Sequence, residues 1–475
     1  MSRPAESVTR SLWLDQALGS EEISDSVQAA SGKTDADIVI VGGGFTGLWT
    51  ALRLKEQEPA LRVALLEADI CGGGASGRNG GFVMSWWAKF LALEALCGTE
   101  EALWLARESE DAIREIGDFC GKHAPYAVFR QDGWLWTATS DKQLGAWEGT
   151  TERLDALRAN PYVPLTREQV AERAGSLRHV GGVLEPAVAT VHPGFLVRAL
   201  RRRALALGVR IHEYSPVTAV TGKYRVTVNT SDAQITADKA VLATNAWSIR
   251  EPEIRQAIVV ASSDVVASAA VPDWLSRVGR NDGLAISDSR AMVHYYRTTS
   301  DGHLIFGKGG GSGLLAFGSR VGKRFDGHSS IPEKVERWMR WTYPDLPAGP
   351  LAADWTGPID KSKSGLPLFG ALSDRPNVLY AVGFSGDGVG PCALAGRIVA
   401  SLALGREDRW ARCGLVRPPE RDFPPEPFRY VGGKFVRRAV ARLDDENDRG
   451  RDGSWLTRKA ASLAPVALSP TKLSE

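Results

Sequence analysis

A glycine-rich turn between an apolar strand and a helix constrains the fold of this chain more than any other feature. The apolar run 37–41 predicts a buried strand, 48–58 carries apolar residues at helical spacing, and 62–67 predicts a second strand. Residues 42–47, with the sequence GGGFTG, stand between the first strand and the helix. Strand, turn, helix and strand within about 30 residues predict a βαβ unit and therefore a parallel sheet.

The glycines of this turn suit a bound dinucleotide. Gly42 can adopt the tight turn, Gly44 lets the backbone approach a pyrophosphate, and Gly47 lets the helix pack close to the sheet. Backbone N–H groups and the positive end of the helix then face the phosphates. Glu67, at the end of the second strand, would accept hydrogen bonds from ribose hydroxyls and disfavours the extra phosphate of NADP. The alternative is a glycine turn that arose by chance, with Glu67 as a surface charge. The order of strand, turn, helix, second strand and acid disfavours this alternative.

A second glycine-rich stretch, residues 72–81, favours FAD over NAD. Ser76, Arg78 and Asn79 place side-chain donors on this backbone, where they suit a second phosphate and an extended flavin. A simple NAD domain would continue with another helix and strand instead. The competing interpretation is a glycine loop without a ligand.

A third glycine-rich stretch, residues 383–390, joins a predicted buried strand at 377–382 to a helix that begins at Pro391. Proline suits the first position of a helix, where its missing N–H group costs nothing. The positive end of this helix would stabilise negative charge at N1 and O2 of a reduced flavin. The alternative is a simple connection between strand and helix.

Charge and cysteine content narrow the partners. Fifty-eight basic and 56 acidic residues give a net charge of +2, so no nucleic-acid partner is expected. The five cysteines include no CxxC pair, so we expect no cysteine-based zinc site and assign no metal. Their odd number, with no signal peptide, predicts a cytoplasmic protein. No run approaches the ~20 apolar residues of a membrane span, so a membrane partner is not expected, and the oligomeric state is left open.

Four motifs together resemble the D-amino-acid oxidase superfamily of FAD-dependent amine oxidoreductases. They lie at 41–47, 74–81, 243–247 and 383–389, and the resemblance covers roughly residues 36–405. Within the superfamily, the chain is most similar to the branch of gamma-glutamylputrescine oxidase and related amine oxidases. The resemblance implies that FAD contacts a set of residues from all four motifs and from two predicted strands between them. These are Gly42, Gly44, Phe45, Thr46, Gly47, Glu67, Ala75, Ser76, Arg78, Asn79, Gly80, Val217, Ala243, Thr244, Trp247, Gly383, Ser385, Gly386, Asp387, Gly388 and Val389.

The sequence departs from the sarcosine-oxidase-like members of this superfamily in two ways. Those members carry a cysteine bonded to the flavin, and near 354–356, where it should fall, this chain has none. We therefore expect FAD to be held non-covalently. They also carry a lysine over the flavin that is linked to oxygen activation. Its position falls near Ile305, with Lys308 as an approximate substitute, which leaves oxidase and dehydrogenase both open.

The predicted hairpin 290–308 supplies the candidate catalytic residues. Arg297 could bind a substrate carboxylate or phosphonate, and the aromatic residues there and at 86–87 could surround an alkylammonium group. Each of these has a structural alternative as a solvated or core residue. The predicted catalytic set is Arg297, Tyr296, His294 and Lys308. His192 is expected to cap the following helix, and Asp387 to have a backbone or solvent-facing role.

These features predict an α/β fold of two domains. A discontinuous Rossmann-like FAD-binding domain, with a central parallel sheet in three layers, takes 36–95, 185–250 and 350–405. A substrate domain with a mainly antiparallel sheet flanked by helices takes 96–184 and 251–349. Residues 1–35 form an N-terminal arm and 406–475 a C-terminal extension, whose helix at 431–443 should dock on the body with a solvated basic face rather than on a membrane.

The predicted function is FAD-dependent oxidation of a primary or secondary amine, or an amino acid, to an imine. Hydride passes to flavin N5, water hydrolyses the imine to an aldehyde or keto acid, and oxygen reoxidises FAD to give hydrogen peroxide. One alternative is an amine dehydrogenase that passes electrons to a quinone or carrier. Another, of a different class, is a flavin-binding regulatory module without turnover.

Overall fold

The computed structural model describes residues 9–21, 27–309 and 313–465. Its first large sheet has six strands in the order β19-β20-β13-β2-β3-β9, all parallel except the edge strand β19. The strands are β2 (Ile38–Val41), β3 (Val63–Leu66), β9 (Arg210–His212), β13 (Lys239–Leu242), β19 (Leu368–Ala371) and β20 (Val378–Val382). The first and last thirds of the chain therefore share one sheet.

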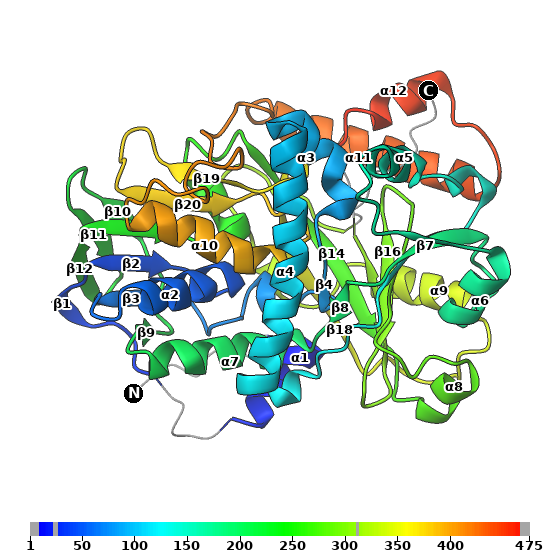
Figure 1. Cartoon of the computed structure of the whole chain (residues 1–475), viewed down its shortest axis with the longest axis horizontal. Helices are drawn as coiled ribbons and strands as arrows, with labels where there is room; N and C mark the ends of the chain where they lie inside the picture. Colours follow the sequence, from blue (N-terminus) through cyan, green and yellow to red (C-terminus); the bar gives the residue numbers. More distant parts are fainter. Residues whose placement is uncertain (1–8, 22–26, 310–312, 466–475) are drawn as a thin grey trace.

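Side-chain alternation in β2 explains the layers around this sheet. Ile38 and Ile40 pack into a core with helices, while Val39 and Val41 face a core shared with a four-stranded sheet. The helices are α2 (Phe45–Gln57), α7 (Pro193–Ala206) and α10 (Pro391–Ala403). The four strands are β1 (Gly32–Asp35), β12 (Ala233–Ala237), β11 (Val226–Asn229) and β10 (Ala219–Thr221). The predicted three-layer arrangement is confirmed, and Figure 1 shows these layers on its left side.

The second large sheet has eight strands in the order β18-β14-β17-β16-β15-β5-β7-β6. Its pairs are antiparallel except β15 with β5, which confirms a mainly antiparallel sheet. The strands are β5 (Trp134–Ala138), β6 (Val163–Leu165), β7 (Gly181–Glu185), β14 (Ile258–Ala267), β15 (Ala285–Asp288), β16 (His294–Thr298), β17 (Leu304–Lys308) and β18 (Ala353–Ser362). Helices α6 (Arg167–Ala174), α8 (Pro272–Arg277) and α9 (Pro332–Thr342) contribute to the core beside it.

The remaining elements connect and cover the two sheets. The helices are α1 (Leu12–Gly19), α3 (Phe90–Cys97), α4 (Thr99–His123), α5 (Glu148–Ala156), α11 (Phe428–Asp448) and α12 (Trp455–Ala461), and β4 (Phe82–Val83) pairs with β8 (Ala189–Thr190). Short 3₁₀ helices lie at Ala75–Gly77, Trp87–Lys89, Pro125–Ala127, Asp141–Gln143, Asn245–Arg250 and Lys323–Asp326. In Figure 1, α4 runs between the two halves of the molecule, and α11 and α12 lie at its upper right.

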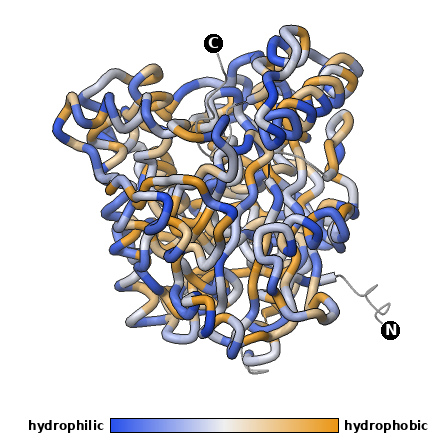
Figure 2. Tube along the Cα trace, turned by 90° about the vertical axis from the view of Figure 1, so that its right-hand side faces the viewer, coloured by the Kyte–Doolittle hydropathy of each residue, from blue (hydrophilic) through white to orange (hydrophobic). Residues whose placement is uncertain are grey.

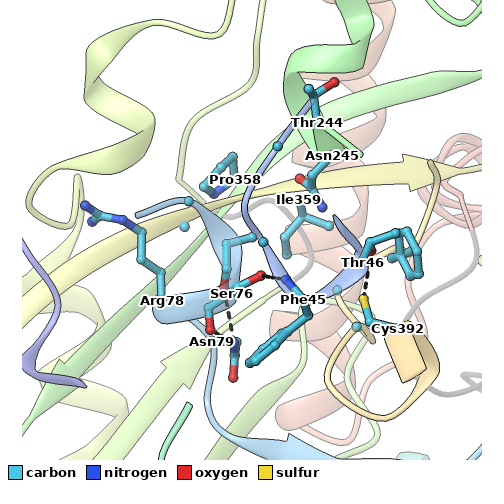
Figure 3. Close-up of a pocket in the computed structure, with 18 of the residues that line it drawn as sticks. Phe45, Thr46, Ser76, Arg78, Asn79, Thr244, Asn245, Pro358, Ile359 and Cys392 are labelled. Atoms are coloured by element: carbon cyan, nitrogen blue, oxygen red, sulfur yellow. Dashed lines mark hydrogen bonds between the residues drawn. The ribbon is translucent and has the colours of Figure 1, made fainter. Parts of the chain in front are cut away.

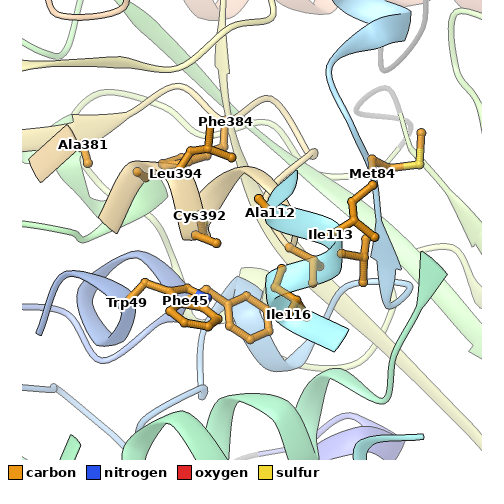
Figure 4. Close-up of a cluster of buried hydrophobic side chains, with 14 of the residues drawn as sticks. Phe45, Trp49, Met84, Ala112, Ile113, Ile116, Ala381, Phe384, Cys392 and Leu394 are labelled. Carbon is orange, nitrogen blue, oxygen red and sulfur yellow. The ribbon is translucent and has the colours of Figure 1, made fainter. Parts of the chain in front are cut away.

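The apolar segments of the chain gather between these elements. In Figure 2, hydrophobic stretches run through the body of the molecule and hydrophilic ones are common in its peripheral turns. Figure 4 shows where α2, α4 and α10 meet, with Phe45, Ile113 and Cys392 among the buried side chains. Close packing needs a glycine here, because a Cβ on Gly396 of α10 would lie 2.8 Å from Trp49 Cβ of α2.

The helices α3 and α4 are separate because Gly98 between them has φ +81° and interrupts the helix. Two predicted segments differ from the observed elements. The C-terminal helix α11 is longer than the expected 431–443. Strand β18, expected within the cofactor domain, is hydrogen-bonded to β14 in the eight-stranded sheet. The domain limits themselves stay a prediction, and residues 1–8 and 22–26 of the expected arm and 466–475 of the expected extension lie outside the described part. No helix in the described ranges is long and apolar enough to cross a membrane.

Candidate functional site

A cavity of about 410 Å³ lies between the two sheets and is lined by segments from the whole length of the chain. It lies beyond the carboxyl ends of β2, β3 and β13, which is where open parallel sheets bind ligands. Figure 3 shows residues from the first two glycine-rich stretches, from the loop after β13 and from β18 around it. Of the predicted FAD-binding residues, Gly47 and Gly383 do not line the cavity, and the other nineteen do.

The first glycine turn has the close packing that the sequence predicts. Gly42 has φ +111°, and a Cβ there would lie 2.4 Å from the carbonyl oxygen of Ala243. A Cβ on Gly47 would lie 2.0 Å from the carbonyl oxygen of Gly42, so a side chain would push the start of α2 away from the turn. Gly44 faces the second glycine-rich stretch, where a Cβ would lie 2.9 Å from Ser76 Oγ. The turn therefore leaves bare backbone facing the cavity, as a pyrophosphate requires.

Glu67 stands at the end of β3 and lines the cavity. Its carboxylate accepts hydrogen bonds from the backbone N–H groups of Gly43, at 2.7 Å, and Asp69, at 3.0 Å. Burial raises the pKa of Glu67, and the two backbone donors partly offset this. A carboxylate held in this way can accept hydrogen bonds from a ribose, as the sequence predicts.

The polar side chains of the second glycine-rich stretch shape the loop itself. Ser76 Oγ accepts a hydrogen bond from Phe45 N at 2.8 Å, and Asn79 donates to the carbonyls of Ala75 and Ser76 at 3.1 and 2.7 Å (Figure 3). Arg78 donates to the carbonyl oxygens of Gly73, Thr356 and Thr9. These bonds tie the loop to α2, to β18 and to the N-terminal arm.

Arg78 also tests whether the cavity suits an anionic cofactor. Its guanidinium is buried, lines the cavity and forms no ion pair with a carboxylate of the described residues. Burial lowers the pKa of Arg78 to about 10. An uncompensated buried cation is unfavourable unless an anion approaches it. The phosphates of a dinucleotide would supply that charge, so the residues present fit FAD.

The third glycine-rich stretch is fixed by two buried acids. Asp360 of β18 accepts hydrogen bonds from Gly383 N at 2.5 Å and Asn245 Nδ2 at 3.2 Å. Asp387 is buried, which corrects the expected solvent-facing role, and it lies 3.8 Å from Lys89 Nζ. Burial raises the pKa of Asp387 to about 6, and Lys89 limits the rise. The loop then leads into α10, which begins at Pro391 as predicted.

The predicted catalytic residues do not gather at the cavity. Tyr296 and His294 lie on the face of β16 that points away from the cavity. The Tyr296 hydroxyl is hydrogen-bonded to His179 Nε2 at 2.7 Å, and His294 Nδ1 lies 2.8 Å from a carboxylate oxygen of Asp288. Arg297 donates to the carbonyl oxygen of Val191 at 2.8 Å and does not line the cavity. Because strand side chains alternate, the neighbouring Tyr295 lines the cavity instead, with its hydroxyl 2.7 Å from Ser263 Oγ.

The expected cavity lysine is also a different residue. Lys308 lies away from the lining, with Nζ 2.8 Å from His294 Nε2, and Ile305 is packed in a small core cluster. Lys361 of β18 lines the cavity, and no hydrogen bond or ion pair joins its ammonium group to the described residues. Burial and the nearby Lys89 lower the pKa of Lys361 to about 8. Lys361 belongs to no recognisable sequence motif, so only the pairing of β18 with β14 shows that it lines the cavity.

The structure also places His192, Trp86 and Trp87, for which the sequence suggested roles. His192 caps α7 as predicted, because its Nδ1 accepts a hydrogen bond from Phe195 N at 3.2 Å. Trp86 and Trp87 are buried and do not line the cavity. The sequence did not single out several lining residues, namely Phe82, Met84, Asn245, Ser263, Val293, Gly357, Pro358, Ile359 and Phe384. The described residues hold no cluster of His, Cys, Asp or Glu suited to a metal.

The lining also bears on how a flavin is attached. Near 354–356 the chain has no cysteine, and Gly357 and Pro358 line the cavity there. Cys392 lines it elsewhere, with Sγ 3.0 Å from Thr46 Oγ1 (Figure 3). Burial raises the pKa of the Cys392 thiol to about 12, so little of the nucleophilic thiolate forms near pH 7. These residues fit a cofactor held without a covalent bond.

A three-layer nucleotide fold that closes a cavity against a mainly antiparallel sheet, with bare glycine backbone and aromatic side chains in the lining, defines an FAD-containing oxidoreductase. The chain belongs to the FAD dependent oxidoreductase family, whose model matches residues 37–402. FAD is therefore its cofactor.

Individual relatives agree with this assignment. The chain is 29% identical to gamma-glutamylputrescine oxidoreductase of Escherichia coli, over 84% of this chain and 89% of that protein. It is 24% identical to glycine oxidase of Pseudomonas putida, over 78% and 95% of the two chains. Among solved structures, glycine oxidase from Geobacillus kaustophilus has the same fold, with a TM-score of 0.64 at 20% identity over 79% of this chain and 96% of that one.

Proposed function

We propose that this protein oxidises a primary or secondary amine to an imine, which water hydrolyses to a carbonyl compound and ammonia or an amine, with oxygen as the final electron acceptor. The observation that carries the proposal is the end of the cavity formed by Phe82, Met84, Val293 and Tyr295, which continues from the flavin-loop residues. The similarity to gamma-glutamylputrescine oxidoreductase supports an amine as substrate.

The residues of the first and third glycine-rich stretches would hold the FAD, and FAD when bound supplies the acceptor for the hydride of the substrate C–H bond. Gly42 and Gly44 present backbone to the pyrophosphate, and Glu67 accepts from the ribose. The N-terminus of α10, after the stretch 383–390, places partial positive charge toward the cavity. That partial charge favours the electron-rich form of the cofactor.

At the substrate end, the protein's own groups bind and orient the amine. Tyr295 and Phe82 have ring centroids 5.9 Å apart and provide an aromatic wall. Burial raises the pKa of Tyr295, so its hydroxyl stays protonated and can serve as a neutral hydrogen-bonding partner. The apolar neighbours exclude water and favour the neutral amine, which hydride transfer requires.

Lys361 is our candidate for the lysine that members of this superfamily use with oxygen. It is the lysine of β18 that lines the cavity, and its ammonium group has no anionic partner among the described residues. A positive charge there can stabilise reduced oxygen species as they form. This role favours oxygen over a quinone or carrier as the acceptor. The five free cysteines of the chain support a reducing, cytoplasmic location.

Anaerobic mixing of the FAD-loaded protein with a panel of amines tests the proposal. The panel holds diamines, N-methylated amines, amino acids and aminophosphonates, and the flavin absorbance reports reduction. At least one amine should bleach the flavin, and oxygen should then restore the colour with one hydrogen peroxide per turnover. If no amine bleaches the flavin, the reaction class is wrong. Bleaching without peroxide at the turnover rate would assign the electrons to another acceptor.

A further inference from the structure

The C-terminal extension lies beyond the family match, which ends at residue 402, yet its helix α11 contacts the wall of the cavity. We propose that Asp444 of α11 is a positioning residue that fixes the segment 288–294 and so shapes the substrate end of the cavity. This inference rests on the proposed function, because it concerns which amines fit. It assigns the extension a part in substrate selection.

Asp444 holds the backbone of the cavity wall directly. Its buried carboxylate accepts hydrogen bonds from Ala291 N at 3.2 Å and from Met292 N at 3.0 Å. Ala291 and Val293 both line the cavity. The two amides have no strand partner at this point, because β16 begins only at His294. The carboxylate of α11 therefore takes the place of a neighbouring strand.

The side chain between the two lining residues packs on the extension. Met292 belongs to a buried cluster with Val440, Leu443 and Ala461, which come from α11 and α12. Ala291 and Val293 line the cavity, and Ala291 also packs against this cluster, in which the Met292 side chain is buried. The extension thus packs directly on the short segment that lines the cavity.

A second anchor lies one turn further along α11. Arg290 donates to Asp448 through Nη2 at 2.7 Å and Nε at 3.1 Å, and to Thr139 Oγ1 at 2.7 Å. Its guanidinium also lies 4.7 Å from the ring centroid of Trp338. Asp444 and Asp448 are four residues apart and so project from the same side of the helix. Together they hold three consecutive residues, Arg290, Ala291 and Met292, within the segment that carries the lining residues.

The extension also holds the chain on the other side of this wall. Arg437 donates to the carbonyl oxygen of Gly313 at 2.7 Å, and Arg429 donates to that of Gly318 at 2.7 Å. Glu426 accepts from Gly318 N at 3.0 Å. The contacted residues, Gly313 and Gly318, come shortly after Gly309 in the chain, and Gly309 lines the cavity. The extension therefore fixes two segments that flank the same end of the cavity, and neither set of contacts touches the glycine turns that hold FAD.

The test compares Asp444→Asn with Asp445→Asn in the full-length, FAD-loaded protein. Asp445 is the exposed neighbour on the same helix, so its variant controls for loss of one negative charge. Two readouts are needed: KM and the limiting rate of anaerobic flavin reduction with the best amine, and hydrogen–deuterium exchange of the amides in 288–294. Asp448→Asn, which removes one of the two carboxylates paired with Arg290, serves as a second variant if Asp444→Asn does not fold.

We expect Asp444→Asn to raise KM roughly tenfold and to speed exchange at residues 291 and 292. The two N–H groups donate to different oxygens of the carboxylate, and the amide nitrogen that replaces one of these oxygens cannot accept a hydrogen bond. The limiting rate and the flavin spectrum should stay within about twofold of wild type, and Asp445→Asn should match wild type in every readout. Equal KM and equal exchange in the two variants would overturn the inference. So would a drop in the limiting rate with unchanged KM, which a general structural role would produce. If the wild type oxidises no amine, the proposed function fails, and the exchange comparison still decides the role of Asp444.

Discussion

Replacing Lys361 with methionine should change how activity depends on pH. Burial and Lys89 lower the pKa of Lys361 from its ordinary 10.5 to about 8, so the cavity carries this positive charge below pH 8 and loses it above. The neutral amine develops positive charge as it loses hydride, and a cationic Lys361 disfavours that developing charge. Two unit charges roughly 8 Å apart, at an effective dielectric constant of about 20, repel by about 2 kcal/mol. In the wild type, kcat/KM should therefore rise roughly tenfold to thirtyfold as the pH passes through about 8.

The same substitution should stabilise the FAD-free protein in a defined pH range. A lysine whose pKa is lower in the folded than in the unfolded chain destabilises the fold at pH values below the folded pKa. Lowering the pKa of Lys361 from 10.5 to about 8 corresponds to about 3 kcal/mol, an upper bound for the gain at pH 7. The gain in stability should shrink between pH 8 and 10.5 and vanish above that range, because Lys361 is then neutral in both the folded and the unfolded chain.

The assay is a pair of pH series on Lys361→Met, with Lys363→Met as the matched control. Lys363 is exposed and pairs with Asp422 at the surface, so its loss should leave both series unchanged. Steady-state kcat/KM is taken as the ratio of variant to wild type, which cancels the titration of the substrate's own amine, and urea unfolding gives the free energy. The ratio should fall by about tenfold between pH 7 and pH 9. A ratio that is flat across pH 8, with no gain in stability at pH 7, would refute the reasoning.

Three further substitutions test the site. Gly47→Ala should abolish FAD binding, because its Cβ would lie 2.0 Å from a carbonyl oxygen, whereas Gly121→Ala in α4, with no atom within 4 Å, should bind FAD normally. Absorbance of the purified proteins checks both, and a yellow Gly47→Ala protein would contradict the packing argument. Glu67→Gln should weaken FAD binding about tenfold in a fluorescence titration, since an amide replaces the carboxylate acceptor; an unchanged Kd would exclude its ribose role. Tyr295→Phe should raise KM for the amine several-fold with an unaltered flavin spectrum, and a changed spectrum with constant KM would place its hydroxyl at the cofactor instead.

Local sequence patterns determined the cofactor half of this protein. Residues 42–47 require glycine wherever backbone passes within contact distance of backbone, and the structure reproduces that requirement at Gly42 and Gly47. The apolar runs before and after the turn are long enough and regular enough to define strands and a helix without any distant contact. The position of Glu67 could be predicted in the same way, because Glu67 directly follows the next strand.

The substrate end could not be read in the same way. Tyr295, Tyr296 and Arg297 are adjacent in the sequence, and only the pairing of β16 with β17 decides which side chain faces the cavity. For the same reason Lys361 lines the cavity and Lys308 does not, since the register of β18 with β14 brings Lys361 to the cavity. A one-residue change of register would reverse each assignment, and nothing local to these residues fixes it.

The sequence alone thus determined the turn chemistry, the order of the elements and the cofactor, because each depends on residues within one βαβ unit or one loop. Tertiary structure alone decided which lysine and which tyrosine enter the cavity. It also decided that α11, more than 130 residues from Ala291 in the chain, supplies the carboxylate of Asp444 to that wall. Buried charges such as Arg78, Lys361 and Asp387 acquire their properties from neighbours that folding brings together, and desolvation depends on that whole surrounding.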